Sequence, residues 1–465
     1  MSHAVLLNRQ GGAVDDGRVA EFAAGLAGRV IRPADADYDT ARSIWNAAID
    51  RHPGLIVRCL GTADVIRAVK FARDNDILVA VRGGGHNVAG RSLCDDGLVI
   101  DLSWMRGVLV DPESRTVRVQ GGALLGDVDR ETHLHGLAVP AGVVSKTGIA
   151  GLALGGGVGY LARKHGLTCD NVLGFELVTA DGGLVATSAE EHPDLFWALR
   201  GGGGNFGIVT SFTFRAHPVS TVLGGLLVHP RERTGELLRF YREFMATAPE
   251  ELTVYSAQVT TPDGMPAAIA IVCYCGEDLA EGERVLAPLR AFGPPLLDAI
   301  QPMPFPAMQQ ALDGAFPDGT YNFWKASFAP ELSDPLIDVL VEHGSRMRSP
   351  LSGLMVEFYG GAPGRVGMGE TAFTQRGAEY NIGFTAQWTD PAESAGHVAW
   401  VRGVYDAVEP FSSGSHFLNF QSEADDAVTR GAFGANYDRL AEVKRKYDPT
   451  NFFSLNQNIR AAAAA

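Results

Sequence analysis

Apolar and polar positions change period several times along the first part of the chain. Val65, Ile66, Val69 and Ala72 follow one another at helical spacing behind Thr62, which can cap a helix over 62–75. The apolar run that follows predicts a strand. Further strands are predicted over 98–102, over 107–120 with a turn at 111–114, and over 208–215, and a hairpin is predicted over 172–187. Further helices are predicted over 124–135 and 192–199. The segment 148–165 is rich in Gly and Ala and is predicted to contain a helix that ends before Gly166.

The pattern changes after residue 218, where glycine becomes less frequent. Strands are predicted over 220–228, on both sides of 261–264, over 269–275, and near 353–359 and 381–388; helices are predicted over 231–246, 278–292 and 331–346. The last segment, 436–459, begins as a helix and continues without a clear period. We therefore expect two domains, the second of which is inserted before the chain returns to the first.

Charge and cysteine content narrow the classes of partner and compartment. The 465 residues carry a formal net charge of −15, and Lys and Arg form no stripe, so nucleic acid and membrane are not expected partners. The five cysteines show no zinc-type spacing and are expected to be reduced, buried thiols. No basic leader and no apolar run of membrane-spanning length occurs, which favours a cytoplasmic protein.

One glycine-rich segment carries the first chemical signal. The strand predicted over 77–81 ends in Arg82 and three glycines, Gly83, Gly84 and Gly85, followed by His86. Glycines expose backbone N–H groups without a Cβ in the way, so this segment can cradle an anion such as phosphate. A simple phosphate loop has no need for an imidazole, so His86 indicates that this site does more than bind phosphate.

Other glycine segments exclude common alternatives. Gly202–Gly207 matches G-x-G-x-x-G, but here a helix precedes the motif and a strand follows it, the reverse of a Rossmann fingerprint. Gly151–Gly159 could wrap a flat ring system or could simply allow close helix packing. No P-loop, serine-hydrolase elbow or metal-ligand constellation is found, and His133 and His135 are expected to be ordinary histidines. Chemistry would then come from a large phosphate-bearing cofactor.

These segments, taken together, resemble the FAD-linked oxidases of the berberine bridge enzyme-like branch of the vanillyl alcohol oxidase superfamily. The matching stretches are 82–86, 148–159, 163–171, 194–207, Trp324-Lys325, 436–438, 447–451 and 455–459. The resemblance implies an α+β fold of two domains, with FAD bound by one and an antiparallel sheet backed by helices in the other. It implies an FAD-binding domain over 1–218, a substrate-binding domain over 219–410, and a C-terminal return to the first domain over 411–465.

The resemblance also implies how the cofactor is held. His86 takes the position that bonds covalently to the flavin 8α-methyl carbon, and Val144 takes the position of a second, cysteine link, so a single tether is expected, as in bacterial members with one link. Thr147 takes an oxygen-gating position and Gly142 lies in the same loop, which favours reaction with O2. FAD contacts are expected from Arg82, Gly83, Gly84, Gly85, His86, Asn87, Gly90, Thr147, Gly148, Gly151, Leu152, Gly155, Gly157, Gly207, Ile208, Val209, Asn456 and Asn458.

The expected reaction is hydride transfer from a small secondary metabolite, alkaloid or sugar to FAD, with O2 reduced to H2O2. Two alternatives stay open: a flavin-dependent oxygenase of natural-product biosynthesis, and a flavoprotein that binds or stores without turnover. The yield of H2O2 per turnover would distinguish the oxygenase from the oxidase, because an oxygenase should release little. Slow reoxidation of the photoreduced flavin in air would indicate the binding protein. No metal is expected, and the protein is expected to be a monomer or homodimer.

A catalytic base must reach the O–H or N–H proton of the substrate. Plant-type members place a glutamate where this chain has Gly383. Tyr437, in a motif that borders the flavin in relatives, is the first choice for the base, and Glu357 is the second. Burial of Glu357 in its apolar strand would raise the pKa of the carboxyl group. If Glu357 instead lies on the open face of the sheet, it has no role in the reaction. Tyr255, Tyr321 and Gln387 are expected to line the substrate pocket, and the aromatic residues around them favour an aromatic or apolar substrate.

Overall fold

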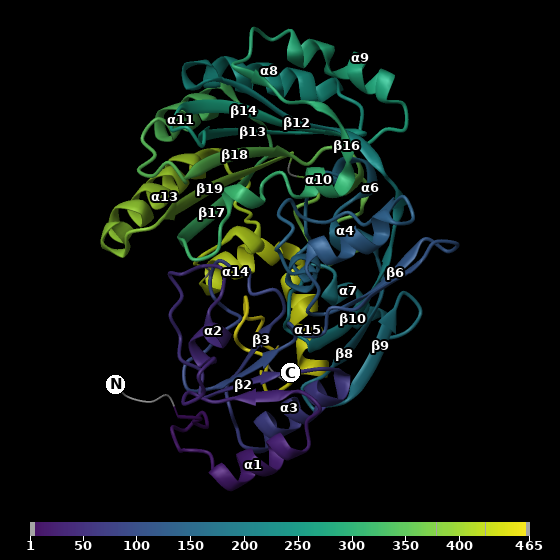
Figure 1. Cartoon of the computed structure of the whole chain (residues 1–465), viewed down its shortest axis with the longest axis vertical. Coiled ribbons are helices and arrows are strands. Elements are labelled where there is room, and N and C mark those ends of the chain that lie inside the picture. The colour runs from purple at the N-terminus through teal and green to yellow at the C-terminus, as the bar shows by residue number, and fades with distance from the viewer. Residues whose placement is uncertain (1–4, 378, 424, 462–465) are drawn as a thin grey trace.

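A computed structural model describes residues 5–377, 379–423 and 425–461, and Figure 1 shows its elements. A four-stranded sheet near the N-terminus has the order β1 (Arg29–Ile31), β2 (Leu55–Arg58), β4 (Leu98–Asp101), β3 (Val79–Arg82). β2 and β3 run parallel to β4, and α3 (Thr62–Asp74) makes the crossover between β2 and β3. Its apolar stripe, with Val65 and Val69, is fully buried under the sheet, so the predicted helix and the strand after it are confirmed.

The second sheet is antiparallel and follows in the chain. It contains β5 (Val108–Asp111), β6 (Thr116–Gln120), β10 (Ile208–Arg215), β8 (Val172–Val178) and β9 (Leu184–Ser188), in that order. Phe175, Phe212 and Phe214 form its aromatic core. Against it pack α4 (Leu125–His133), α7 (Pro193–Leu199) and α15 (Tyr437–Tyr447). The yellow C-terminal helices therefore lie on the first part of the chain in Figure 1.

The predicted helix within 148–165 is only partly correct. The structure has α5 (Ile149–Leu154) and α6 (Ala162–His165), separated by an extended stretch. Gly156 and Gly157 adopt φ values of +113° and +77°, a region that ends a helix and that other residues avoid. The second helix does end before Gly166, as predicted, because Gly166 also has a positive φ.

The third and largest sheet has eight antiparallel strands. Its order is β15 (Leu297–Asp298), β12 (Thr221–Pro230), β14 (Pro266–Tyr274), β13 (Leu252–Thr260), β18 (Gly353–Phe358), β19 (Tyr380–Trp388), β17 (Tyr321–Ala329), and β16 (Gln301–Pro304) pairs with β12. One face packs against α8 (Thr234–Thr247), α9 (Leu279–Arg290), α11 (Asp334–Gly344) and α13 (Ser394–Val408). This antiparallel sheet backed by helices, together with the first two sheets, confirms the expected α+β fold (Figure 1).

The other face of the eight-stranded sheet is turned toward the first part of the chain. Tyr255 and Ala257 of β13 and Met355 of β18 share this face and pack against Tyr160 and Leu161. Shorter elements complete the chain: α1 (Asp16–Ala24), α2 (Tyr38–Arg42), β7 (Leu137–Ala138) paired with β11 (His217–Pro218), α10 (Phe305–Gln309), α12 (Ala362–Arg365) and α14 (Asp426–Phe433).

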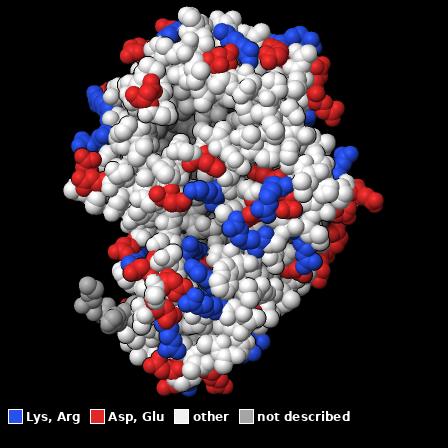
Figure 2. Space-filling view, in the orientation of Figure 1, with Lys and Arg blue, Asp and Glu red and all other residues white. Residues whose placement is uncertain are grey.

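The surface and the cysteines agree with the composition. Figure 2 shows acidic and basic side chains interspersed over the visible face, with a hollow between the upper and middle parts of the molecule. All five cysteines are free and buried. Within the described residues, no helix has the length and apolar character needed to cross a bilayer.

Candidate active site

A deep cavity lies where the three sheets meet. Its walls come from the segment after β3, from α5 and the loop before it, from 201–209, from the inner face of the eight-stranded sheet and from the C-terminal segments. Among the residues expected to bind the cofactor or to take part in catalysis, those that line the cavity are Gly83, Gly84, Gly85, His86, Asn87, Thr147, Gly148, Gly151, Leu152, Gly155, Gly207, Ile208, Val209, Asn456 and Glu357.

Glycine is required where two of these segments touch. A Cβ on Gly84 would lie 2.5 Å from the Cα of Gly148, and a Cβ on Gly148 would lie 2.5 Å from the nitrogen of Gly84. Gly85 has a φ of +68°, which turns the chain directly before His86. The two glycine segments thus form one continuous backbone wall with no side chains in the way of a ligand.

Four of the expected cofactor contacts lie outside the cavity wall. The Arg82 guanidinium donates to the Ala41 carbonyl at 2.5 Å, so this side chain ties β3 to α2. Gly90 has a positive φ and faces Ile49, and a Cβ on Gly157 would lie 2.4 Å from the Thr168 hydroxyl. These two glycines therefore serve close packing. Asn458 is the fourth; its Oδ1 is buried and has no hydrogen-bond partner in the described chain.

Polar atoms without partners mark where a ligand would fit. Nε2 of His86, Oγ of Ser92 and Oδ1 of Asn456 belong to cavity-lining residues, and each is buried without a hydrogen-bond partner in the described part of the chain. A buried polar group is normally satisfied, so such atoms point to an absent partner. Hydroxyl, amide and imidazole groups beside bare glycine backbone suit a ligand that has phosphate, ribityl and heteroaromatic parts, which fits FAD.

Ser92 and its neighbour Arg91 line the cavity but are not among the residues predicted from the sequence. Arg91 donates to the Asn456 carbonyl and so joins the loop after His86 to the C-terminal segment. Their position a few residues after the glycine segment was an available signal. The aromatic wall formed by Phe417 and Phe420 lies in a stretch with no periodic pattern, so no signal in the sequence indicated it.

Glu357 is a carboxylate that lines the cavity. It lies on the cavity-facing side of β18 and is 1% exposed, so it is buried and does not lie on an open face of the sheet. Burial raises its pKa from the usual 4.5 to about 7, against the lowering effect of hydrogen bonds from Asn381 and Tyr359. Asn381 Nδ2 donates at 2.7 Å and the Tyr359 hydroxyl at 3.2 Å, and both bonds end on Oε2. Oε1 is the oxygen left for the cavity.

Tyr437 does not line this cavity. It is the first residue of α15, is 8% exposed and packs in the core of the five-stranded sheet, with the Arg430 guanidinium 4.1 Å from its ring centre. The motif that suggested Tyr437 therefore begins a helix whose first side chain packs in the core and does not line the cavity.

The three expected pocket residues also lie outside the cavity wall. Tyr321 stacks with Trp388 on the helix-covered face of the sheet. Gln387 is buried, and its amide donates to the Ala315 carbonyl at 3.2 Å. Tyr255 is paired directly with Glu357 across β13 and β18, and its hydroxyl is buried without a partner in the described residues.

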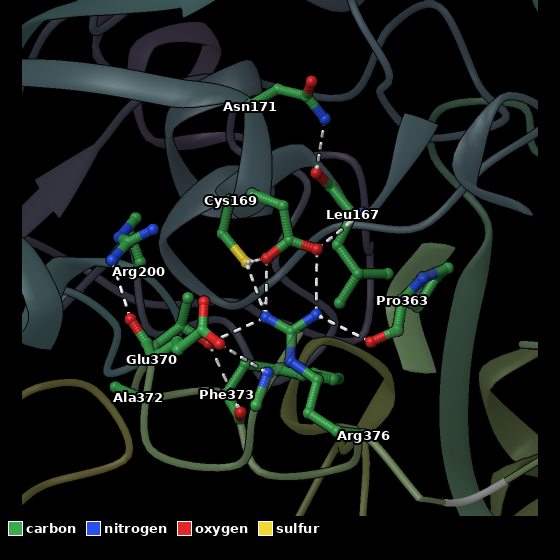
Figure 3. A network of polar contacts seen from close by, with 12 residues as sticks. Leu167, Cys169, Asn171, Arg200, Pro363, Glu370, Ala372, Phe373 and Arg376 are labelled. Carbon is green, nitrogen blue, oxygen red and sulfur yellow. Dashed lines mark hydrogen bonds and ion pairs between the residues drawn. The ribbon is translucent and has the colours of Figure 1, made fainter. Parts of the chain in front are cut away.

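An ion pair fastens the β18–β19 connection to the glycine side of the cavity (Figure 3). Both terminal nitrogens of Arg376 donate to the Asp170 carboxylate, at 2.8 and 2.6 Å, and a third bond reaches Thr371 at 2.7 Å. The same connection places Phe373 against Gly156 and Gly201, so tightly that a Cβ on either glycine would collide with it. These contacts thus hold the eight-stranded sheet against the glycine segments.

Comparisons with known proteins agree with this geometry. A family model described as an FAD binding domain matches residues 53–188, and one described as berberine and berberine like matches 416–460. An FAD-linked oxidoreductase of Dictyostelium discoideum is 31% identical over 95% of this chain and 96% of its own length. (R)-6-hydroxynicotine oxidase of Paenarthrobacter nicotinovorans is 32% identical over 93% of this chain and 97% of its own length.

Solved structures give the same answer. The structure of 6-hydroxy-D-nicotine oxidase from Arthrobacter nicotinovorans has a TM-score of 0.85 at 31% identity and covers 94% of this chain and 98% of its own. Physcomitrella patens BBE-like 1 has a TM-score of 0.87 at 25% identity and covers 96% of this chain and 100% of its own. The chain therefore belongs to the berberine bridge enzyme-like family of FAD-linked oxidoreductases.

Proposed function

We propose that the protein is an oxidase that removes a hydride from a C–H bond of a small molecule and passes the electrons to O2, which leaves as H2O2. Bound FAD supplies the hydride acceptor. The protein's own contribution is to bind and orient the substrate and to take its proton. The observation that carries the proposal is Glu357, a buried carboxylate that lines the cavity and has a pKa of about 7.

Glu357 is our choice for the base, in place of Tyr437. A carbon that loses a hydride becomes a carbonyl or imine only when the attached O–H or N–H also loses its proton. A base whose pKa lies near the working pH is well matched to that transfer. Oε1 accepts the proton, while the bonds from Asn381 and Tyr359 hold Oε2 in place.

Aromatic side chains support a flat, largely apolar substrate. Phe316, Trp324 and Phe420 line the cavity, and their rings pack edge to face. Met355 and Thr385 line the wall beside Glu357. A relative is named for 6-hydroxynicotine, a small aromatic compound that contains nitrogen. An aromatic amine or alcohol of similar size is therefore the substrate class that we propose.

We propose that a single covalent bond through His86 tethers the flavin. Burial lowers the pKa of His86 to about 4, so the imidazole is uncharged and able to act as a nucleophile at neutral pH. Val144 lines the cavity at the position of the second link and carries no nucleophile. Gly142 and Thr147 also line the cavity, and their small size supports access of O2.

The proposal is tested by mixing the protein anaerobically with aromatic amines and alcohols and following the bleaching of flavin absorbance. Admitting air to the bleached protein should restore the absorbance and release one H2O2 for each substrate oxidised. Bleaching followed by little peroxide and an oxygenated product would instead indicate the oxygenase. Failure of every compound to bleach the flavin, with slow reoxidation after photoreduction, would contradict an oxidase and favour a binding protein.

Two variants test the base once a substrate is known. Glu357→Gln should slow anaerobic flavin reduction by about 10²- to 10⁴-fold, the usual contribution of a general base. In the wild type, kcat/KM should rise with pH through an apparent pKa near 7, because only the ionised carboxylate takes the proton. Tyr437→Phe is the matched comparison and should reduce the flavin at close to the wild-type rate. The reverse result would assign the base to Tyr437.

A further inference from the structure

One tryptophan lies directly on the imidazole of His86. The Trp45 indole and the His86 ring are parallel, with centroids 4.3 Å apart and planes inclined by only 11°. Trp45 is 5% exposed and belongs to a small apolar cluster with Val88 and Trp324. Neither the glycine segment nor the expected catalytic residues account for this stacked pair.

Trp45 is fixed from several directions. Its backbone nitrogen donates to the Gly85 carbonyl at 3.3 Å, immediately before His86. Its indole nitrogen donates to the Phe316 carbonyl at 3.1 Å, and Trp324 meets the indole edge to face at 5.1 Å. The indole plane therefore cannot rotate without breaking a hydrogen bond and a ring contact.

The next residue extends the connection in both directions. The Asn46 side chain donates to the Val88 carbonyl at 2.8 Å and to the Asn322 carbonyl at 3.0 Å. Asn46 also forms a parallel bridge with Thr320. The segment at Trp45 is thus hydrogen-bonded both to the loop that carries His86 and to β17, at the edge of the eight-stranded sheet.

The stacking constrains a buried ring nitrogen of His86 that has no hydrogen-bond partner in the described chain. His86 lines the cavity, and its Nε2 is buried with no hydrogen-bond partner among residues that the structure describes. A ring held flat by a fixed indole keeps its edge, and hence Nε2, turned in one direction. Holding a reacting atom in its attack geometry accelerates a reaction, and a misplacement of 1 Å can cost about 100-fold.

We propose that Trp45 is a positioning residue for covalent attachment of FAD to His86, in which it holds the imidazole plane so that Nε2 meets the flavin 8α-methyl carbon. The inference rests on the proposed tether. In the net reaction an N–C bond forms, the methyl carbon and the imidazole each lose one proton, and two electrons pass through the flavin to O2. Dioxygen, the acceptor in the proposed function, takes up both electrons and both protons and leaves as H2O2.

The experiment measures attachment separately from binding. Protein produced in a riboflavin-limited host, and therefore largely free of flavin, is incubated aerobically with FAD, and samples are denatured in acid over time. The flavin that stays with the polypeptide is compared with the total bound flavin. Trp45→Leu should bind FAD but attach it about 10- to 100-fold more slowly. Trp45→Phe, which retains a flat ring, should recover most of the rate.

Trp388→Leu is the matched control, because Trp388 also stacks on a histidine, His397, but does so on the helix-covered face of the eight-stranded sheet, away from the cavity. It should attach flavin at the wild-type rate. If Trp45→Leu does not fold, Trp45→Met replaces it as the variant without a ring. Equal attachment rates in the wild type and in the Trp45 variants without a ring would overturn the proposal. A wild-type protein that releases all its flavin would overturn the tether itself, and this proposal with it.

Discussion

A single buried carboxylate has opposite effects on the proposed reaction and on stability. The folded protein holds the proton of Glu357 up to about pH 7, whereas an exposed glutamate releases it near 4.5. The free energy of unfolding therefore falls as pH rises between these values, and the full cost, about 3 kcal/mol, is present above pH 7. This loss of stability falls on the residue that we propose as the catalytic base.

Glu357→Gln should accordingly make the holoenzyme more stable at about pH 8, by up to ~3 kcal/mol, and little different near pH 4.5. The amide oxygen can still accept the bonds from Asn381 and Tyr359. Thermal unfolding at the two pH values measures the difference. Glu113→Gln, in an exposed turn, is the control and should change stability at neither pH. A stabilisation of equal size at both pH values would contradict the raised pKa.

Residue patterns could indicate much of this site, but not its cross-strand contacts. The glycines after β3 and His86 are local signals, and Tyr359 follows Glu357 at the period of a strand, so the sequence places both on one face. Asn381 comes from another strand, and its pairing with Glu357 depends on a register that no local pattern gives. Tyr437 shows the opposite case: its motif suggested a place at the site, but the first turn of α15 directs the ring into the core.

At the scale of elements, the pair Arg376–Asp170 holds the β18–β19 connection against the 3-10 helix Thr168–Asn171. The Arg376 side chain is 2% exposed and that of Asp170 is 9% exposed. Removing one member of a buried pair leaves the other charge uncompensated, which costs about 3–5 kcal/mol. Asp170→Asn should lower the free energy of unfolding by about this amount, and adding Arg376→Met should recover part of it. Thermal unfolding of the single and double variants measures both effects.

The same connection contains a matched control. Arg365 of α12 pairs with Glu250, and both side chains are largely exposed, at 60% and 38%. Breaking this pair with Glu250→Gln should cost no more than about 1 kcal/mol, because water and salt screen it. A loss for Asp170→Asn as small as that of Glu250→Gln would show that the buried pair contributes little.

Element prediction succeeded where local pattern and packing agree. The strands β12 to β14, β18 and β19 and the helices α8, α9 and α11 follow from the apolar period of the sequence. α13 is absent from the sequence-based predictions; it contains Gly396 and Gly403, which lower intrinsic helix propensity. Burial of Trp400, Val401 and Val404 against the eight-stranded sheet offsets that penalty, a tertiary effect that no local window contains.

On the scale of the whole molecule, the cavity joins parts of the chain that are far apart in sequence. Its wall includes segments after β3, on β17 to β19, and at 453–457 near the C-terminus. The last of these is anchored by Lys444, which is buried and donates to Asp448 at 2.6 Å and to the carbonyls of Asn205 and Phe453. A ligand that fills the cavity touches all of these parts, so its binding should stabilise the molecule as a unit.

This coupling distinguishes a tethered cofactor from a free one. A ligand that binds only the folded state adds RT ln(1 + [L]/Kd) to stability, about 1.4 kcal/mol for each tenfold rise in concentration above Kd. In His86→Ala, where no bond can form, the melting temperature should therefore rise steadily with added FAD. If the wild type carries the proposed tether, its cavity is already filled, and added FAD should leave the melting temperature unchanged. Differential scanning calorimetry across a range of FAD concentrations makes the comparison, and parallel slopes for the two proteins would mean that His86 holds its flavin by reversible contacts alone.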